Sequence, residues 1–187
     1  MKKTEQTLLD NMTGEDALRI LRALCATDPA IRKRIICEAQ RVLVDVDVDE
    51  TSEMVLSDLE ALCVEDLWDR AGPSNRGYSS PDEMAVQMFE EAIQPHKQEI
   101  EKFRRLGMPT PCMHYLMGTL KGIYRFEKEA KSEFKDWATD VPAEIFGFLV
   151  DGWRKNAGKK DKTHMNKFIT EQCPDWADWA TKDRTAT

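Results

Sequence analysis

The chain has 187 residues, of which 41% are apolar and 33% are charged, and its formal net charge is −7. This length and apolar content predict one domain with a buried core, or a domain with an appendage, and exclude a generically disordered chain. The acidic balance disfavours nucleic acid as a partner, because phosphate binding depends on Lys and Arg.

Residues 1–12 carry two lysines but no apolar stretch of the kind found in a secretory signal peptide. The uncharged run 107–120 contains two prolines and is too short to span a bilayer. The five cysteines are scattered and odd in number, which favours buried thiols over disulfides. We therefore expect a cytoplasmic protein without a membrane segment.

Two amphipathic helices are predicted at about 14–26 and 29–44. The first helix has apolar residues at helical spacing, namely Ala17, Leu18, Leu21, Leu24 and Cys25. Asp28 can cap the second helix and Pro29 can occupy its first position, where a missing N–H costs nothing. The second helix also projects a basic set, Arg32, Lys33, Arg34 and Arg41.

This helix pair resembles a HEAT-like helical repeat. The features that carry the resemblance are the leucines of the first helix and Asp28, Pro29, Ile31 and Arg32 at the start of the second. The resemblance covers about one repeat, and no second copy recurs at a fixed period. It implies a scaffold that binds proteins or nucleic acids, and it implies no catalytic residues.

The rest of the chain also predicts helices, separated by irregular segments. We expect an acidic connector at 44–50, a helix at 51–63 and a long irregular stretch at 64–81. Ser80-Pro81 starts a helix that Pro95 should break or kink and that Gly107 should end. Further helices should follow near 111–127, 131–138 and from Asp140, where Ile145, Phe148, Leu149 and Trp153 should point inward; a linker should occupy 156–163.

The predicted architecture is all-α, an irregular stacked-helix domain of the HEAT-like or α-α superhelix kind with a small helical C-terminal appendage. We divide it into an N-terminal extension (1–12), a helical domain (13–157) and a helical tail (158–187). The tail carries Trp176 and Trp179 one helical turn apart. These rings can dock on the parent domain or join two subunits of a homo-oligomer.

An acidic segment runs from Asp45 to Asp69 without a single Lys or Arg. Its start, Asp45-x-Asp47-x-Asp49, imitates a calcium loop, but Glu50 stands where that loop needs Gly and Leu56 where it needs Glu. The segment is therefore a solvated acidic face or a docking patch for a basic partner. Within the chain, we expect its complement in the basic set of 29–44 or around 97–105.

The candidate binding residues lie in the 64–81 stretch: Trp68, Asp69, Arg70, Asn75, Arg76 and Tyr78. Two arginines can clamp a carboxylate or phosphate, and the aromatic rings can stack on a ligand. The structural alternative is that Trp68 fills the core while Asp69 and Arg70 anchor the loop.

Other chemistries have weaker sequence support. The three histidines, His96, His114 and His164, lack metal-ligand spacing, so we expect no metal and no cofactor. A Ser or Cys nucleophile remains open, although no G-x-S-x-G motif is present. Gly118-x-x-x-Gly122 indicates close approach of two helices, or else backbone that lines a ligand site.

We therefore expect a non-enzymatic protein–protein interaction module with an unidentified protein partner. The first alternative is a small-molecule binder or enzyme with Asp69, Arg70, Arg76 and His114 converging between 64–81 and helix 111–127. The second is nucleic-acid association through Arg32, Lys33, Arg34 and Arg41.

Overall fold

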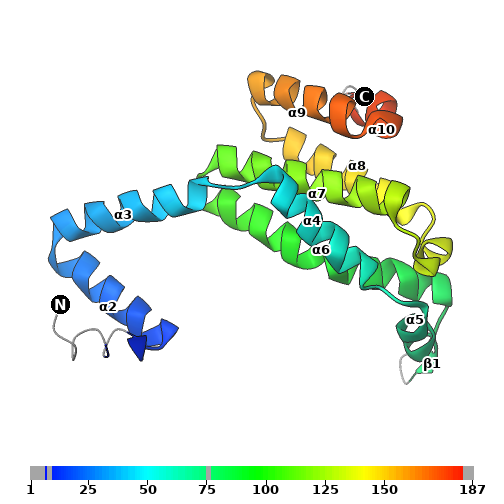
Figure 1. Ribbon diagram of the computed structural model, residues 1–187, viewed down its shortest axis with the longest axis horizontal. Helices are drawn as coiled ribbons and strands as arrows, with labels where there is room; N and C mark the ends of the chain where they lie inside the picture. The colour runs from blue at the N-terminus through cyan, green and yellow to red at the C-terminus, as the bar shows by residue number, and fades with distance from the viewer. Residues whose placement is uncertain (1–6, 8–9, 75–76, 183–187) are drawn as a thin grey trace. The chain divides into compact units, whose positions relative to one another are not determined.

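The computed structural model describes residue 7, residues 10–74 and residues 77–182, and it confirms the predicted all-α class (Figure 1). The chain divides into two compact units, Met1–Asp45 and Val46–Thr187. The α-helices are α2 Gly14–Thr27, α3 Pro29–Val44, α4 Val48–Glu60, α5 Val64–Arg70, α6 Pro81–Arg105, α7 Pro109–Glu129, α8 Val141–Arg154, α9 Lys159–Gln172 and α10 Pro174–Ala180. A 3₁₀ helix, η1 Glu133–Trp137, and a small hairpin, β1 Gly72–Ser74 with β2 Gly77–Ser79, complete the described elements.

The first unit contains the helix pair expected from the sequence. The Thr13 hydroxyl caps α2 by accepting from the Asp16 amide. The Asp28 carboxylate caps α3 by accepting from the amides of Ala30 and Ile31 at 2.8 and 3.2 Å. These caps fix the corner between the helices, so the two predicted helices are confirmed almost to the residue. The pair is compatible with a helical-repeat fold.

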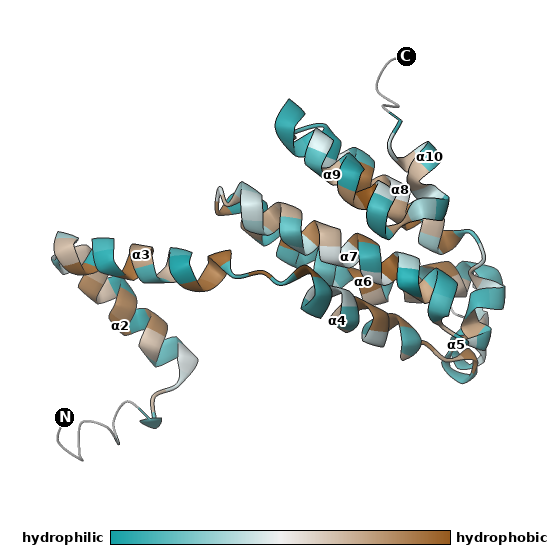
Figure 2. Ribbon diagram, turned by 45° about the horizontal axis from the view of Figure 1, so that its top comes forward, coloured by the Kyte–Doolittle hydropathy of each residue, from teal (hydrophilic) through white to brown (hydrophobic). Residues whose placement is uncertain are grey.

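The second unit is built around α4, α6 and α7, which lie side by side (Figures 1 and 2). Its core is one apolar cluster that includes Leu59, Phe89, Leu120 and Phe126, all fully buried. Helices α8, α9 and α10 extend this cluster through Phe146 and other side chains. The predicted tail helices thus pack in the same compact unit as α4–α8, while the domain division proposed above stays a prediction.

Glycines allow α4 and α7 to approach closely, as the Gly118-x-x-x-Gly122 spacing predicted. A Cβ atom on Gly118 would lie 2.4 Å from the Thr51 Cβ and 2.8 Å from the Val48 carbonyl oxygen. A Cβ on Gly122 would lie 2.6 Å from the Val55 Cβ and 2.8 Å from the Ser52 carbonyl oxygen. The absent side chains therefore give α4 the space it occupies.

Three predicted irregular segments are more regular than expected. The 64–81 stretch forms α5 and the antiparallel hairpin, in which Gly72 pairs with Ser79 and Pro73 with Tyr78. Short elements of this kind leave no helical or alternating apolar pattern long enough to detect. The acidic connector predicted at 44–50 is shorter than expected, because α4 already begins at Val48. The linker predicted at 156–163 is wrong from Lys159 onward, because α9 begins there.

Pro95 does not break its helix, because α6 runs continuously from Pro81 to Arg105. Burial of Ile93 and His96 on either side of the proline holds this part of α6 in the core. The helix ends as predicted at Gly107, whose φ of +66° suits glycine. The Gly107 amide donates to the Arg104 carbonyl and the Met108 amide to the Phe103 carbonyl, which is the Schellman pattern.

We predict that Ser80→Ala lowers the free energy of unfolding by about 1 kcal/mol, because Ser80 is one half of a capping box. Its hydroxyl accepts from the Glu83 amide at 3.2 Å, and the Glu83 carboxylate accepts from the Ser80 amide at 3.1 Å. Urea denaturation followed by circular dichroism measures the change. The control is Ser57→Ala, at an exposed position inside α4, which should not lower stability.

Candidate functional site

Of the predicted binding residues, those that the structure describes lie on a short protrusion formed by α5 and the hairpin. Trp68 is 52% exposed and Tyr78 is 70% exposed. The Trp68 ring contacts the Trp137 ring edge-on, with centroids 5.1 Å apart, so it does not fill the core as the structural alternative assumed. Asn75 and Arg76 lie outside the described residues. The binding role predicted for the other four residues stays a prediction; they are Trp68, Asp69, Arg70 and Tyr78.

Arg70 already has a partner in the structure. Its guanidinium donates to the Glu91 carboxylate on α6 at 2.7 Å, and Glu91 also accepts from Gln87. These two hydrogen bonds, with the Gln87 bond the larger cause, lower the pKa of Glu91. Arg70 therefore anchors α5 to α6, as the structural alternative predicted.

A pocket lined by Asp69, Arg70 and His114 was predicted between the 64–81 segment and α7. None of these three residues lines the cavity described below. The part of α7 around Gly118 and Gly122 is occupied by α4. The described contacts do not join His114, half-buried near the start of α7, to Asp69 or Arg70. The enzyme or ligand-binding alternative therefore stays a prediction, and the residues described do not form a common site for it.

The acidic segment has ion-pair partners on α7, which lie outside the basic sets of 29–44 and 97–105 in which its complement was predicted. Asp49 pairs with Lys121 at 2.7 Å, and Glu53 pairs with Arg125 at 2.6 Å. The Asp47 carboxylate caps α4 by accepting hydrogen bonds from the backbone amides of Glu50 and Asp49. These two hydrogen bonds lower the pKa of Asp47. The prediction missed these pairs because each joins positions 72 residues apart in the sequence. The acidic side chains Asp49 and Glu53 thus hold α4 against α7.

A buried histidine joins three helices. His96 on α6 is 4% exposed; its Nε2 lies 2.9 Å from the Asp58 carboxylate of α4 and its Nδ1 lies 3.0 Å from the Tyr115 hydroxyl of α7. In a neutral ring, a proton on Nε2 donates to Asp58 and leaves Nδ1 to accept from Tyr115. Burial, followed by the charges of Glu99 and Asp58, raises the pKa of Tyr115. The helical spacing of His96 from Phe89, Ile93 and Phe103 signals its burial, but sequence shows neither partner.

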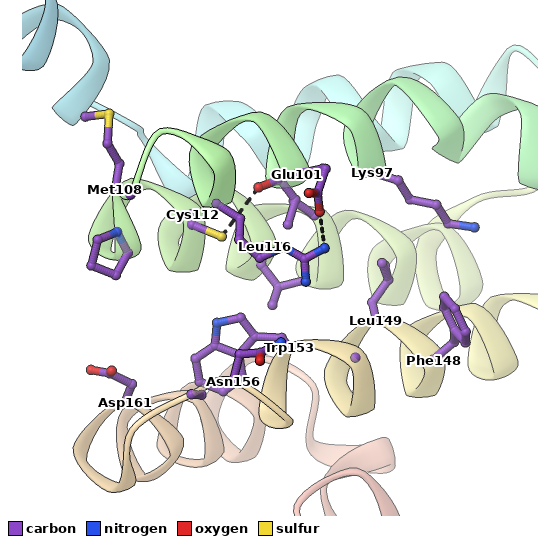
Figure 3. A pocket seen from close by; sticks show the side chains of 16 residues that line it. Lys97, Glu101, Met108, Cys112, Leu116, Phe148, Leu149, Trp153, Asn156 and Asp161 are labelled. Atoms are coloured by element: carbon purple, nitrogen blue, oxygen red, sulfur yellow. Dashed lines mark hydrogen bonds and ion pairs between the residues drawn. The ribbon is translucent and has the colours of Figure 1, made fainter.

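A cavity of about 460 Å³ lies between the ends of α6, α7, α8 and α9 (Figure 3). Its walls are mainly apolar and include Ile100, Met108, Leu116, Leu149 and Trp153. Lys97 and Phe148 lie at one end of the cavity in Figure 3, and Met108 and Asp161 lie at the other. The prediction that Phe148 faces the core is wrong, because this residue is 71% exposed and lines the cavity.

The charged groups of the cavity are unequally engaged. Glu101 and Arg104 pair with each other across one turn of α6. The Lys97 ammonium lies over the Phe148 ring, 5.8 Å from its centroid. Cys112 points its thiol toward the Ile100 carbonyl oxygen at 3.5 Å, and burial raises the pKa of that thiol. The neutral thiol form is therefore favoured, which argues against Cys112 as a nucleophile.

The helices of the first unit alternate hydrophobic and hydrophilic residues along their length (Figure 2). No side chain of α2 or α3 is buried. Their exposed large apolar side chains, between 39% and 68% accessible, are Leu18, Ile20, Leu21, Leu24, Ile36, Val42 and Val44. We define this set as the α2–α3 apolar surface. The amphipathic pattern of both helices was predicted from the sequence, but the exposure of their apolar residues was not.

The tail tryptophans dock within the chain. Trp176 is buried, and its ring contacts Tyr124, Phe146 and Trp179 with centroids 5.0 to 6.0 Å apart. Asp175 pairs with Lys128 of α7 at 2.7 Å, and that contact lowers the pKa of Asp175. Homo-oligomerisation through Trp176 and Trp179 stays a prediction, and it would require α10 to detach from this aromatic cluster.

Comparison of the chain with protein-family models, curated proteins and solved structures finds no match. Within residues 7, 10–74 and 77–182, no group of three or more His, Cys, Asp or Glu side chains is placed to hold a metal ion. None of the helices described has both the length and the apolar character needed to cross a membrane.

Proposed function

We propose that this chain is a protein–protein interaction module whose α2–α3 apolar surface receives a partner. The observation that carries the proposal is the complete lack of buried side chains in these two helices, despite their many large apolar residues. Two helices of this length gain little stability from hydrogen bonding alone and need apolar burial. Large exposed apolar side chains in such number are typical of a binding site.

The chemistry around the surface favours an acidic amphipathic helix as the partner. Helix α3 carries Arg32, Lys33, Arg34 and Arg41 against one acid, Glu38, which pairs with Arg41 at 2.9 Å. A partner helix with leucine-type side chains on one face and carboxylates beside them would bury the apolar surface and neutralise the remaining cations. The same charges disfavour a second copy of α3 packed directly against the first.

The apolar residues of α2 also have the spacing that a helical partner needs. Leu18, Leu21 and Leu24 recur every three residues and Leu21 is followed by Cys25 at i+4, so they form a stripe along one side. Such a stripe can interdigitate with the side chains of a facing helix. This supports recognition of a helix in preference to an extended peptide.

We predict that Leu21→Asp weakens capture of the partner roughly thirtyfold, because it places a carboxylate in the centre of the apolar surface. The matched control is Tyr78→Asp, which makes the same kind of change on the α5–hairpin protrusion. The full chain would be used as bait in a lysate of its source. Any captured protein would then be tested as purified material, and its acidic helix as a synthetic peptide.

The outcomes discriminate between the candidate functions. Binding lost in Leu21→Asp and kept in Tyr78→Asp, with a peptide that binds, supports the proposal. The reverse pattern would overturn it and place the contact on the predicted residues Trp68, Asp69, Arg70 and Tyr78. A wild-type dimer that Leu21→Asp converts to a monomer would identify a second copy as the occupant. Capture of nucleic acid that disappears with rising salt would favour the role of Arg32, Lys33 and Arg34 in phosphate binding.

A further inference from the structure

We propose that the cavity between α6, α7, α8 and α9 binds a small apolar molecule that carries a carboxylate. This site lies within the second compact unit and is independent of the α2–α3 apolar surface. Its volume of about 460 Å³ falls in the range of small-molecule sites, roughly 300–1,000 Å³. Mainly apolar walls with a few polar groups are also typical of such sites.

The walls are suited to an elongated apolar body. Leu116 and Cys112 of α7 face Trp153 and Leu149 of α8 across the cavity (Figure 3). Ile100 of α6 also lines it. Gly152 adds to the free space, because a Cβ atom at this position would meet no atom within 4 Å. Burial of an alkyl chain or a flat ring system against these side chains would supply most of the affinity.

The charges of the cavity direct a carboxylate toward Lys97. The cationic guanidinium of Arg104 is already neutralised by Glu101, and Asp161 at the opposite end would repel an anion. Among the described residues, the Lys97 ammonium forms no ion pair, and its recorded contact is with the Phe148 ring. A carboxylate beside Lys97 would gain a charge-assisted hydrogen bond, while the apolar body would extend toward Met108.

Cys112 supports reversible binding at this site. Burial raises the pKa of its thiol, with the Arg104 charge opposing that effect, so the thiol stays protonated at neutral pH. A protonated thiol is a poor nucleophile and behaves as a small apolar wall. The proposed molecule therefore binds without forming a covalent bond to the protein.

The test uses decanoate, 1-decanol and decylamine as probes, below the concentrations at which they form micelles. Calorimetry measures each affinity. We expect the full chain to bind decanoate at least tenfold more tightly than decanol or decylamine. Lys97→Gln should remove this preference and leave decanol binding unchanged. The matched control Lys131→Gln removes one positive charge from an exposed residue that does not line the cavity, and it should bind as wild type does.

Two substitutions at Gly152 test the cavity itself. Gly152→Phe should place its ring in the cavity and reduce decanoate affinity at least tenfold. Gly152→Ala adds one methyl group and should keep most of the binding, which controls for a change at this helix position. The proposal is overturned if the wild type binds none of the three probes, or if Gly152→Phe binds decanoate as well as Gly152→Ala. A folded Lys97→Gln variant that retains the full preference for decanoate would overturn the assignment of the carboxylate to Lys97.

Discussion

Trp176→Ala is expected to lower the free energy of unfolding by about 3–5 kcal/mol, the range observed when a buried aromatic side chain is truncated. Trp176 is 7% exposed and contacts three aromatic rings, those of Tyr124, Phe146 and Trp179. Its loss would leave a cavity at the junction of α7, α8 and α10. Helix α10 has only seven residues and depends on this burial to remain in place.

Urea denaturation followed by circular dichroism would measure this effect. The matched control is Trp68→Ala, the same chemical change at a ring that is 52% exposed and contacts Trp137 alone among the aromatic side chains described. That contact predicts a loss of about 1 kcal/mol. Equal losses for the two variants would contradict the placement of Trp176 in the shared core. A wild-type dimer that Trp176→Ala converts to a folded monomer would instead support the subunit contact through Trp176 and Trp179 predicted from the sequence.

Helix caps and long apolar periods account for what the sequence predicted well. Asp28-Pro29 and Ser80-Pro81 start α3 and α6 at the expected residues, because the side chains that satisfy the first amides of a helix are local. Gly107 ends α6 for the same kind of reason. Local chemistry of this sort can be inferred without knowledge of the tertiary fold.

Features that depend on distant contacts were predicted less well. Burial of α6 around Ile93 and His96 keeps Pro95 inside a continuous helix, although the residue alone predicts a break or kink. The pairing of the acidic segment with Lys121 and Arg125 cannot be inferred from runs of charge, because these two residues stand outside both of the basic sets that the sequence offers. The same limit applies to the cavity, whose lining comes from four helices.

The amphipathic pattern of α2 and α3 illustrates a different limit. Periodicity shows that Leu18, Leu21 and Leu24 share a face, but it does not show what covers that face. In the structure, these side chains are exposed. A pattern that is usually typical of a core helix therefore supports a helix at an interface in this unit. Function in this unit is therefore proposed from the difference between the sequence pattern and the observed burial.

Gly122→Ala is expected to lower the free energy of unfolding by about 1–3 kcal/mol, although alanine normally favours a helix by about 1 kcal/mol over glycine. The new Cβ would lie 2.6 Å from the Val55 Cβ and 2.8 Å from the Ser52 carbonyl oxygen. The second of these atoms belongs to the backbone of α4, so a rotamer change cannot relieve the clash. Helix α4 would have to move away from α7, which would weaken the largest helix contact in the unit.

The matched control for this prediction is Gly152→Ala, the same substitution inside α8 where the new Cβ meets nothing within 4 Å. It should raise the free energy of unfolding by about 0.5–1 kcal/mol, because only the helix preference changes. Urea titrations of both variants and the wild type provide the comparison. If the free energy of unfolding falls in Gly122→Ala and rises in Gly152→Ala, the steric contact with α4, and not the helix preference, explains the glycine at position 122. A stabilised Gly122→Ala protein would contradict the close approach of α4 and α7.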